Sequence, residues 1–223
     1  MKQRLGLINK CFIKNKWIMK NVNFNHQTYF KKDSCCFQKV DTEWGGLSNM
    51  KGIVYPLLVN KRRILTSEAL YQACRFPDFP EIQEEIIKQK SPMAAKMKSK
   101  PHRLKCTRAD FEEEKVAIMY WCLRVKLACN PNGFGHLLKK SGTKPIVEVS
   151  HKDKFWGTMV SKTNSNEFEG INVLGQLLME LRSFYLVNQE SKAYLTVEPL
   201  TIPNFKLFGE PIETIVHPSL LNK

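Results

Sequence analysis

One lysine stands where helical spacing favours an apolar side chain. Projected at about 100° per residue, the segment 107–129 places Phe111, Ile118 and Cys122 in one narrow stripe, and Lys115 falls inside it. Burying an unpaired ammonium is very costly, so a lysine in this place must be neutralised, paired or directed into a pocket. Desolvation lowers the pKa of a lysine and provides a nucleophilic free amine. Alternatively, only the stem of Lys115 is buried and its ammonium reaches the helix edge.

Two carboxylates stand in places suited to acid–base chemistry. Glu68 lies in the sequence Thr66-Ser67-Glu68 at a predicted helix start, where the helix dipole stabilises a carboxylate and capping alone explains its presence. Asp153 precedes Trp156-Gly157 in a polar segment without packing periodicity. An acid and an aromatic side chain in a loop after a buried strand often line a ligand site. The alternative is a surface loop whose tryptophan packs beneath it.

A glycine-containing turn precedes the last predicted helix. Gly170 and Gly175 flank Asn172, and backbone N–H groups at a helix start can receive a phosphate. Such a short turn alone has low specificity. The GxGxxG, P-loop, HExxH and GxSxG motifs are absent. Kinase, Rossmann oxidoreductase, zinc hydrolase and serine hydrolase functions therefore lack their usual sequence support.

The cysteines indicate neither a disulfide framework nor a metal site. Their number, seven, is odd, their spacing is irregular, and no CxxC pair occurs. Reduced thiols in a cytosol fit this pattern, so we expect a cytoplasmic protein with no metal or cofactor. The longest apolar runs are too short to span a bilayer. The segment 1–20 carries lysines where a signal peptide needs an uninterrupted apolar core.

The formal net charge of +14 is concentrated in two places. Residues 1–32 hold eight Lys or Arg and no acid, and the segment from Lys96 to Arg108 is also basic without an acid. Such clusters attract phosphate-bearing partners, including nucleic acids and nucleotides. The alternative for the N-terminal cluster is a solvated lysine-rich surface.

Periodicity and capping residues predict the elements that position these side chains. Helices dominate and strands are few and short, which favours an α+β fold with one α-rich domain. Thr66 and Ser91 are the expected N-caps of helices that start near 66 and 92. The other expected elements are two strands within 53–64, a helix starting near 80, a long helix from 107–110 to about 129, a turn at 131–135, a strand at 144–150, a long loop at 151–169 and a helix at 172–186.

The chain divides into three predicted parts. Residues 1–33 form a basic N-terminal extension, 34–187 the domain, and 188–223 a C-terminal tail. The tail holds four prolines and one segment of alternating polarity around residue 195. We expect it to lend one strand and no domain of its own.

Seven sequence blocks, in order, resemble the NADAR family of ADP-ribose and ribosyl-amine glycosidases, over roughly residues 37–185. Each block is short, but the ordered set is specific. The blocks are Gly46-Leu47-Ser48-Asn49, Thr66-Ser67-Glu68 with Tyr71-Gln72-Ala73, Ser91-Pro92-Met93-Ala94-Ala95, Arg108-x-Asp110-Phe111-x-x-x-Lys115, Val147-Glu148, Asp153-x-x-Trp156-Gly157, and Gly170-x-Asn172-x-Leu174-Gly175 with the leucine-rich run that follows.

The resemblance implies an α-rich domain that hydrolyses an N-glycosidic bond between ribose C1′ and an exocyclic amine. The family acts on ADP-ribosylated guanine in nucleic acid and on early riboflavin-pathway ribosyl-amines. The basic clusters favour the nucleic-acid substrate. A riboflavin-intermediate glycosidase and a non-catalytic ADP-ribose-binding module are the alternatives. The expected partner is therefore ADP-ribosylated nucleic acid or a small ribosyl phosphate, without a membrane.

The implied roles divide between catalysis and binding. Glu68 or Asp153 protonates the ribose ring oxygen, and Lys115 attacks C1′ to form a Schiff base, with Lys96 as the second candidate. The binding roles are stacking on the base by Trp156 and Phe111 beside Gly157, contacts from Asn49 and Asn172 to ribose hydroxyls, and a contact from Arg108 or nearby lysines to phosphate.

Two positions depart from the family pattern. Ala69 replaces a histidine that usually follows the Ser-Glu pair, and Phe111 replaces a tryptophan. An aromatic wall survives at Phe111, but the hydrogen bonds of an imidazole and an indole are lost. These departures concern the identity of the substrate more than the class of reaction.

Overall fold

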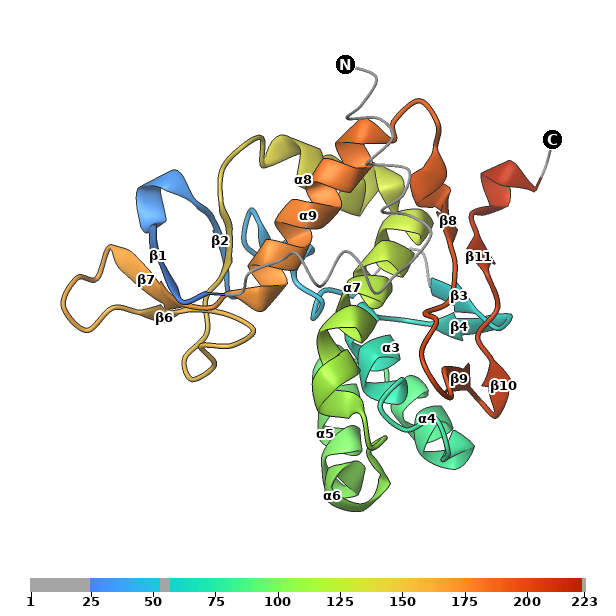
Figure 1. The fold of residues 1–223 in the computed structure, drawn as a ribbon. Coiled ribbons are helices and arrows are strands. Elements are labelled where there is room, and N and C mark those ends of the chain that lie inside the picture. The colour runs from blue at the N-terminus through green and yellow to red at the C-terminus, as the bar shows by residue number, and fades with distance from the viewer. Residues whose placement is uncertain (1–24, 53–56, 222–223) are drawn as a thin grey trace.

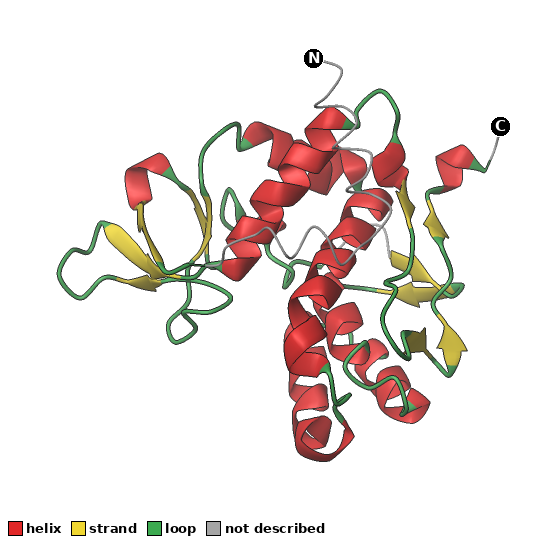
Figure 2. Cartoon of the chain, in the orientation of Figure 1, coloured by secondary structure: helices red, strands yellow, loops and turns green. Residues whose placement is uncertain are grey.

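The computed structural model describes residues 25–52 and 57–221 (Figure 1). Most of the predicted basic extension and the first residues of the first predicted strand lie outside this part. Within it, helices form the centre and strands lie at both sides (Figure 2). The predicted α-rich α+β class is confirmed. The helices are α3 (Ser67–Ala73), α4 (Pro80–Ile87), α5 (Pro92–Ser99), α6 (Arg103–Cys106), α7 (Phe111–Cys129), α8 (His136–Lys140) and α9 (Val173–Val187).

Helix α7 is the axis of the core. It packs against α3 and α9, and its central side chains Ile118, Cys122 and Leu123 are fully buried. Leu70 of α3 and Leu178 of α9 belong to the same cluster. The buried face of α9 repeats at helical spacing, as the leucine run predicts.

Five short strands form two small sheets at one side of α9 (Figure 1). β7 pairs antiparallel with both β1 and β6, and β2 pairs parallel with β5. The side chains of Tyr29, Val147 and Phe168 make a small second core there. The strands are β1 (Gln27–Phe30), β2 (Cys35–Phe37), β5 (Ile146–Glu148), β6 (Met159–Val160) and β7 (Glu167–Gly170).

One sequence expectation about local structure was wrong, and one helix was missed. The segment 151–169 is not one long loop, because β6 lies inside it and β7 begins at its end. The long helix begins at Phe111 with Asp110 as its N-cap, at the end of the predicted range 107–110, and residues 103–106 form the separate helix α6. The predicted turn at 131–135 is a π-helical turn, and it leads into α8, which was not predicted. Two-residue strands and one-turn helices are too short to produce a periodic signal.

The predicted extension and tail both contribute to the folded structure. β1 lies within residues 1–33 and pairs over its whole length with β7. The tail supplies four strands, where one was expected, and Val197 and Leu207 are fully buried. Trp121 of α7 donates a hydrogen bond of 3.0 Å to the carbonyl of Glu198. The remaining strands are β3 (Leu57–Val59), β4 (Arg62–Ile64), β8 (Thr196–Val197), β9 (Lys206–Leu207), β10 (Glu210–Pro211) and β11 (Ile215–Val216).

Helix caps predicted from the sequence are confirmed at two helices. The hydroxyl of Thr66 accepts a hydrogen bond of 3.0 Å from the backbone N–H of Ala69 at the start of α3. The hydroxyl of Ser91 accepts one of 3.1 Å from Ala94 at the start of α5. Each satisfies a backbone donor that has no partner within its helix.

Removing the exposed cap of α5 provides a test of its contribution to stability. We expect Ser91→Ala to lower the free energy of unfolding by about 1 kcal/mol, because the N–H of Ala94 loses its acceptor. Ser91→Asp keeps an acceptor and should remain close to the wild type. Urea denaturation followed by circular dichroism measures both. An equal loss in the two variants would contradict the capping role.

Candidate active site

A cleft of about 590 Å³ opens between α3, α5 and the loop after β5. Its volume lies in the range of small-molecule sites. Its lining is strongly polar and contains side chains from distant parts of the sequence: Asn49, Met50, Glu68, Tyr71, Gln72, Arg75, Lys96, Arg103, Met119, Glu148, Ser150, Lys152, Asp153, Lys154, Phe155, Trp156 and Leu174.

Glu68 is the buried carboxyl group of the α3 wall, with 3% of its surface exposed. One carboxylate oxygen accepts a hydrogen bond of 2.5 Å from the side-chain amide of Asn49, and the other accepts one of 2.9 Å from Gln72. Burial raises the pKa of this carboxyl group, and the positive charge of Lys96 opposes the rise. The two amide donors replace part of the hydration that the Glu68 carboxylate loses on burial, so they also oppose the rise in its pKa.

The loop that carries Asn49 is held in place by a buried lysine of α7. Lys126 of α7 donates hydrogen bonds of 2.9 Å to the carbonyl of Gly46 and 2.8 Å to that of Ser48. Burial lowers the pKa of its ammonium to about 7. Sequence reasoning missed this residue, although Lys126 projects only about 20° from Lys115 on the same helix.

Glu148 is a half-buried carboxyl group and was not among the predicted site residues. It ends β5 and lines the cleft opposite α3. Burial raises its pKa to about 7, and the negative charges of Asp153 and Glu68 add to the rise against the charge of Lys96. An acid at the end of an apolar strand was the available sequence signal, since its neighbours Ile146 and Val147 are fully buried.

Asp153 shapes the loop that presents the aromatic wall. One of its carboxylate oxygens accepts hydrogen bonds of 2.9 Å from the backbone N–H groups of Phe155 and Trp156. The Trp156 ring meets Phe155 and Tyr71 edge-on, with centroids 5.2 and 5.8 Å apart. Asp153 therefore holds the turn in which the indole lines the cleft.

The structure brings half of the predicted site residues to the cleft. The five that line it are Asn49, Glu68, Lys96, Asp153 and Trp156. The other five lie outside the lining: Lys115, Phe111, Arg108, Gly157 and Asn172.

Lys115 lies partly buried on the surface of α7, with 22% of its side chain exposed. Its ammonium forms an ion pair with Glu112, one turn earlier, and lies 4.5 Å from the centre of the Phe155 ring. The stem is covered while the charge is paired at the helix edge, which matches the second of the two sequence interpretations.

Phe111 and Arg108 support the site from outside. Phe111 is buried, and its ring lies 6.0 Å from that of Tyr71 and 3.7 Å from the Arg75 guanidinium. Phe111 therefore packs against two residues that line the cleft, Tyr71 and Arg75, but does not line it itself. Arg108 pairs with Asp110 and donates a hydrogen bond of 2.6 Å to the carbonyl of Pro203, so its guanidinium anchors the tail.

Asn172 and Gly157 hold the backbone of Glu148. The fully buried amide of Asn172 donates 2.9 Å to the Ile146 carbonyl and accepts 3.1 Å from the N–H of Glu148. Its backbone is left-handed, with φ of 57°, which asparagine tolerates well. At Gly157, an added Cβ would lie 2.8 Å from the Glu148 carbonyl oxygen, so only glycine permits this approach.

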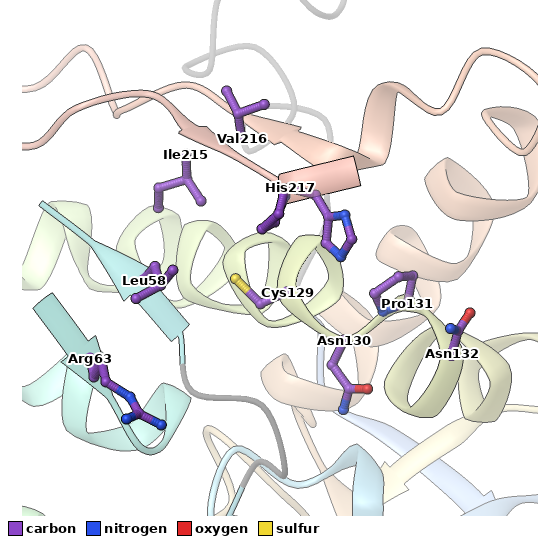
Figure 3. A pocket seen from close by; sticks show the side chains of 10 residues that line it. Leu58, Arg63, Cys129, Asn130, Pro131, Asn132, Ile215, Val216 and His217 are labelled. Atoms are coloured by element: carbon purple, nitrogen blue, oxygen red, sulfur yellow. The ribbon is translucent and has the colours of Figure 1, made fainter. Parts of the chain in front are cut away.

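A second cavity of about 480 Å³ lies between the C-terminal end of α7, the β3–β4 hairpin and the tail (Figure 3). Its lining is mainly apolar, with Arg63 and His217 among its polar side chains. No carboxylate occurs among the described residues that line it. The first cleft, which combines acids, cations and an aromatic ring, is therefore the candidate active site.

Neither metal-binding groups nor bilayer-spanning helices are found in the described residues. Within 25–52 and 57–221, no cluster of three or more His, Cys, Asp or Glu side chains is placed to hold a metal. In the same part of the chain, every helix is too short or too polar to cross a bilayer. The six described cysteines are free thiols.

The fold and the cleft together define an α+β domain with an acid- and lysine-lined ligand site. The NADAR domain model matches residues 24–184, and the chain belongs to this family, as its sequence blocks predicted. The solution structure of the Escherichia coli protein YbiA superposes with a TM-score of 0.58 at 29% identity, covering 70% of this chain and 88% of that one.

Curated relatives carry names from riboflavin biosynthesis and glycosidase chemistry. The chloroplastic riboflavin biosynthesis protein PYRR of Zea mays is 35% identical over 126 residues, 53% of this chain and 19% of that protein. A riboflavin biosynthesis protein of Vibrio vulnificus is 30% identical over 66% of this chain and 37% of its own length. An N-glycosidase of Acanthamoeba polyphaga mimivirus is 34% identical over 32% of this chain and 45% of its own. The chain thus spans less than half the length of each.

The positioning role of Asn172 can be tested by its effect on stability. We expect Asn172→Ala to lower the free energy of unfolding by about 2–4 kcal/mol, because two buried backbone groups lose their partners. Asn166→Ala, at an exposed position, is the control and should stay within about 0.5 kcal/mol of the wild type. Thermal and urea unfolding measure both. Unchanged stability with a raised KM would instead support direct ribose binding.

Proposed function

We propose that the chain is an N-glycosidase that hydrolyses the bond between ribose C1′ and an exocyclic amine. The observation that carries this proposal is the cleft itself, which is lined by the buried carboxyl group of Glu68, the half-buried one of Glu148 and the lysine Lys96. An acid can open the ribose ring of such an aminal, and an amine can capture the resulting imine. The N-glycosidase name of the mimivirus relative supports this class of reaction.

The remaining lining suits a nucleotide-like substrate. Trp156 offers a ring for a purine or pyrimidine, and Asn49 lies within reach of the ribose. Arg75, Arg103, Lys152 and Lys154 supply positive charge for phosphate groups. Arg103 is held in place by hydrogen bonds of 3.1 Å to the Gln72 side chain and 2.9 Å to Ser99.

Lys96 is the proposed nucleophile, because it lines the cleft and Lys115 does not. A carboxylic acid first protonates the ring oxygen, and the C1′–O4′ bond breaks as C1′ forms an imine with the amine of the base. Lys96, after giving a proton to the Glu68 carboxylate, attacks C1′. The base then leaves as a free amine, and a Schiff base forms between C1′ and Lys96. Water hydrolyses it, and O4′ closes the ribose again.

ADP-ribosylated guanine in nucleic acid is the proposed substrate. The side chains of Lys98, Lys100 and Lys105 are exposed and add positive charge to the segment that holds Lys96 and Arg103, with Lys98 paired to Glu85. A polymer with a charged backbone benefits from such a surface, whereas a small metabolite needs only the cleft.

A riboflavin-pathway ribosyl-amine is the second candidate. The names of the plant and Vibrio relatives favour it. It needs the same reaction at C1′ and one phosphate contact. The two substrates differ in salt dependence, because only the polymer releases many counterions on binding.

Borohydride trapping during turnover tests the reaction and its nucleophile together. We expect the protein to release ADP-ribose from an oligonucleotide carrying ADP-ribosylated guanine, and mass spectrometry to locate a reduced adduct on Lys96. Lys96→Ala should lower kcat at least about 10²-fold and abolish the adduct, since the covalent route is lost. Lys139→Ala, an exposed lysine of α8 outside both the cleft lining and the basic segment 96–108, is the control and should keep the wild-type rate.

Each other outcome has a defined meaning. An adduct on Lys115 would move the nucleophilic role to that residue, and turnover without any adduct would remove the Schiff base. Release from a ribosyl-amine metabolite alone would select the second substrate. Tight binding of ADP-ribose without turnover of either substrate would identify a binding module.

A further inference from the structure

The two carboxyl groups of the cleft have opposite hydrogen-bonding environments. Both oxygens of Glu68 accept hydrogen bonds from side-chain amides, one from Asn49 and one from Gln72. The Gln72 amide is oriented in turn, because its oxygen accepts 2.8 Å from the Ser99 hydroxyl and 3.1 Å from Arg103. Donors on both oxygens favour the ionised form of a carboxyl group. These donors oppose the rise in pKa that burial causes at Glu68, and they occupy both of its oxygens as acceptors.

Glu148 has no comparable donors. In the part of the chain that the structure describes, its carboxyl group takes part in no hydrogen bond and no ion pair. The charges that face it are the acids Glu68 of α3 and Asp153 of the following loop, and the ammonium of Lys96 on α5. Two negative neighbours and partial burial favour the neutral form of a carboxyl group. The surroundings of Glu148 thus favour the protonated form of its carboxyl group.

The position of Glu148 is fixed through its backbone alone. Its N–H is bound by Asn172, and its carbonyl accepts 2.7 Å from the N–H and 2.9 Å from the hydroxyl of Thr158. The close approach of Gly157 completes this support. The strand end is therefore rigid while the carboxyl group stays free to meet a ligand, which is the geometry a proton donor requires.

We propose that Glu148 is the general acid of the reaction, a role that rests on the proposed glycosidase function. It gives its proton to O4′ as the C1′–O4′ bond breaks, and it becomes a carboxylate. When O4′ closes on the C1′ aldehyde of the hydrolysed product, the O4′ hydroxyl proton returns to Glu148, and the carbonyl oxygen takes the proton that Glu68 accepted from Lys96. Glu68 stays in the other role, as the carboxylate that takes the proton of Lys96. The two carboxyl groups thus have different roles: Glu148 begins protonated and donates, and Glu68 begins ionised and accepts.

The pH profile of kcat tests this assignment. A general acid works only while protonated, so kcat of the wild type should fall as the pH rises through about 7, the pKa to which burial and the acidic neighbours raise Glu148. Glu148→Gln should lower kcat about 10²- to 10⁴-fold and remove this alkaline decline. Glu148→Asp retains a proton donor and should keep the decline, with a smaller loss of rate.

Two controls separate the possible failures. Melting curves and binding of ADP-ribose should be close to wild type for Glu148→Gln, because the variant keeps the shape of the side chain. Asp153→Asn tests the competing donor: loss of the alkaline decline there, with the decline retained in Glu148→Gln, overturns the proposal. If the wild type turns over and Glu148→Gln keeps both rate and decline, the assignment of Glu148 fails alone. If the wild type releases neither ADP-ribose nor ribosyl phosphate, the proposed glycosidase function fails instead.

Discussion

The burial of Glu68 is the constraint on which the organisation of the cleft depends. A carboxyl group removed from water costs free energy unless donors replace its hydration. Asn49 and Gln72 provide these donors, and each is held by a further group. The Asn49 loop is fixed by the buried ammonium of Lys126, and Gln72 by Ser99 with Arg103. The environment of one carboxyl group therefore ties α3 to α5, α6 and α7.

The opposite wall follows a different principle. There, the amide of Asn172 joins the start of α9 to the backbone of β5, so that strand and helix are fixed without any contact to the Glu148 carboxyl group. Asp153 applies the same principle to the loop, since its carboxylate binds backbone N–H groups of Phe155 and Trp156. Because Asn172 and Asp153 form hydrogen bonds with backbone groups, the wall is held in place without using the carboxyl group of Glu148 or the ring of Trp156. This explains why Asn172 and Gly157 belong to sequence blocks that resemble the family and yet do not line the cleft.

Long, periodic or capped elements could be predicted from the sequence, and short ones could not. The caps at Thr66 and Ser91 marked α3 and α5 correctly, and the leucine run marked α9. The strands β6 and β8–β11 have two residues each, which carry no alternation that a sequence pattern could reveal. Their place is set by partners distant in the chain, as in the pairing of Ile215 with Val197.

The candidate site was only partly predictable, for a reason that the two lysines of α7 make clear. Helical projection puts Lys115 and Lys126 within about 20° of each other, yet only Lys126 is fully buried. The difference lies in what each lysine meets: Lys115 has an acid one turn away, whereas Lys126 faces the carbonyls of Gly46 and Ser48. A helix face predicts that a charge must be accommodated. The partner that accommodates it belongs to another segment and appears only in the fold.

The charges of the cleft couple substrate binding to proton transfer. Five cations line it, from Arg75, Lys96, Arg103, Lys152 and Lys154, against three acids, Glu68, Glu148 and Asp153. An anionic substrate is drawn in by this excess. Two of these cations, Arg75 and Arg103, lower the pKa of Glu68, and phosphate groups bound to them would neutralise that effect. The negative charge that the phosphates bring into the cleft adds to that of Glu68 and Asp153, which already raise the pKa of Glu148. Substrate binding therefore further favours the protonated form of Glu148, so the proton donor is strengthened when the substrate is present.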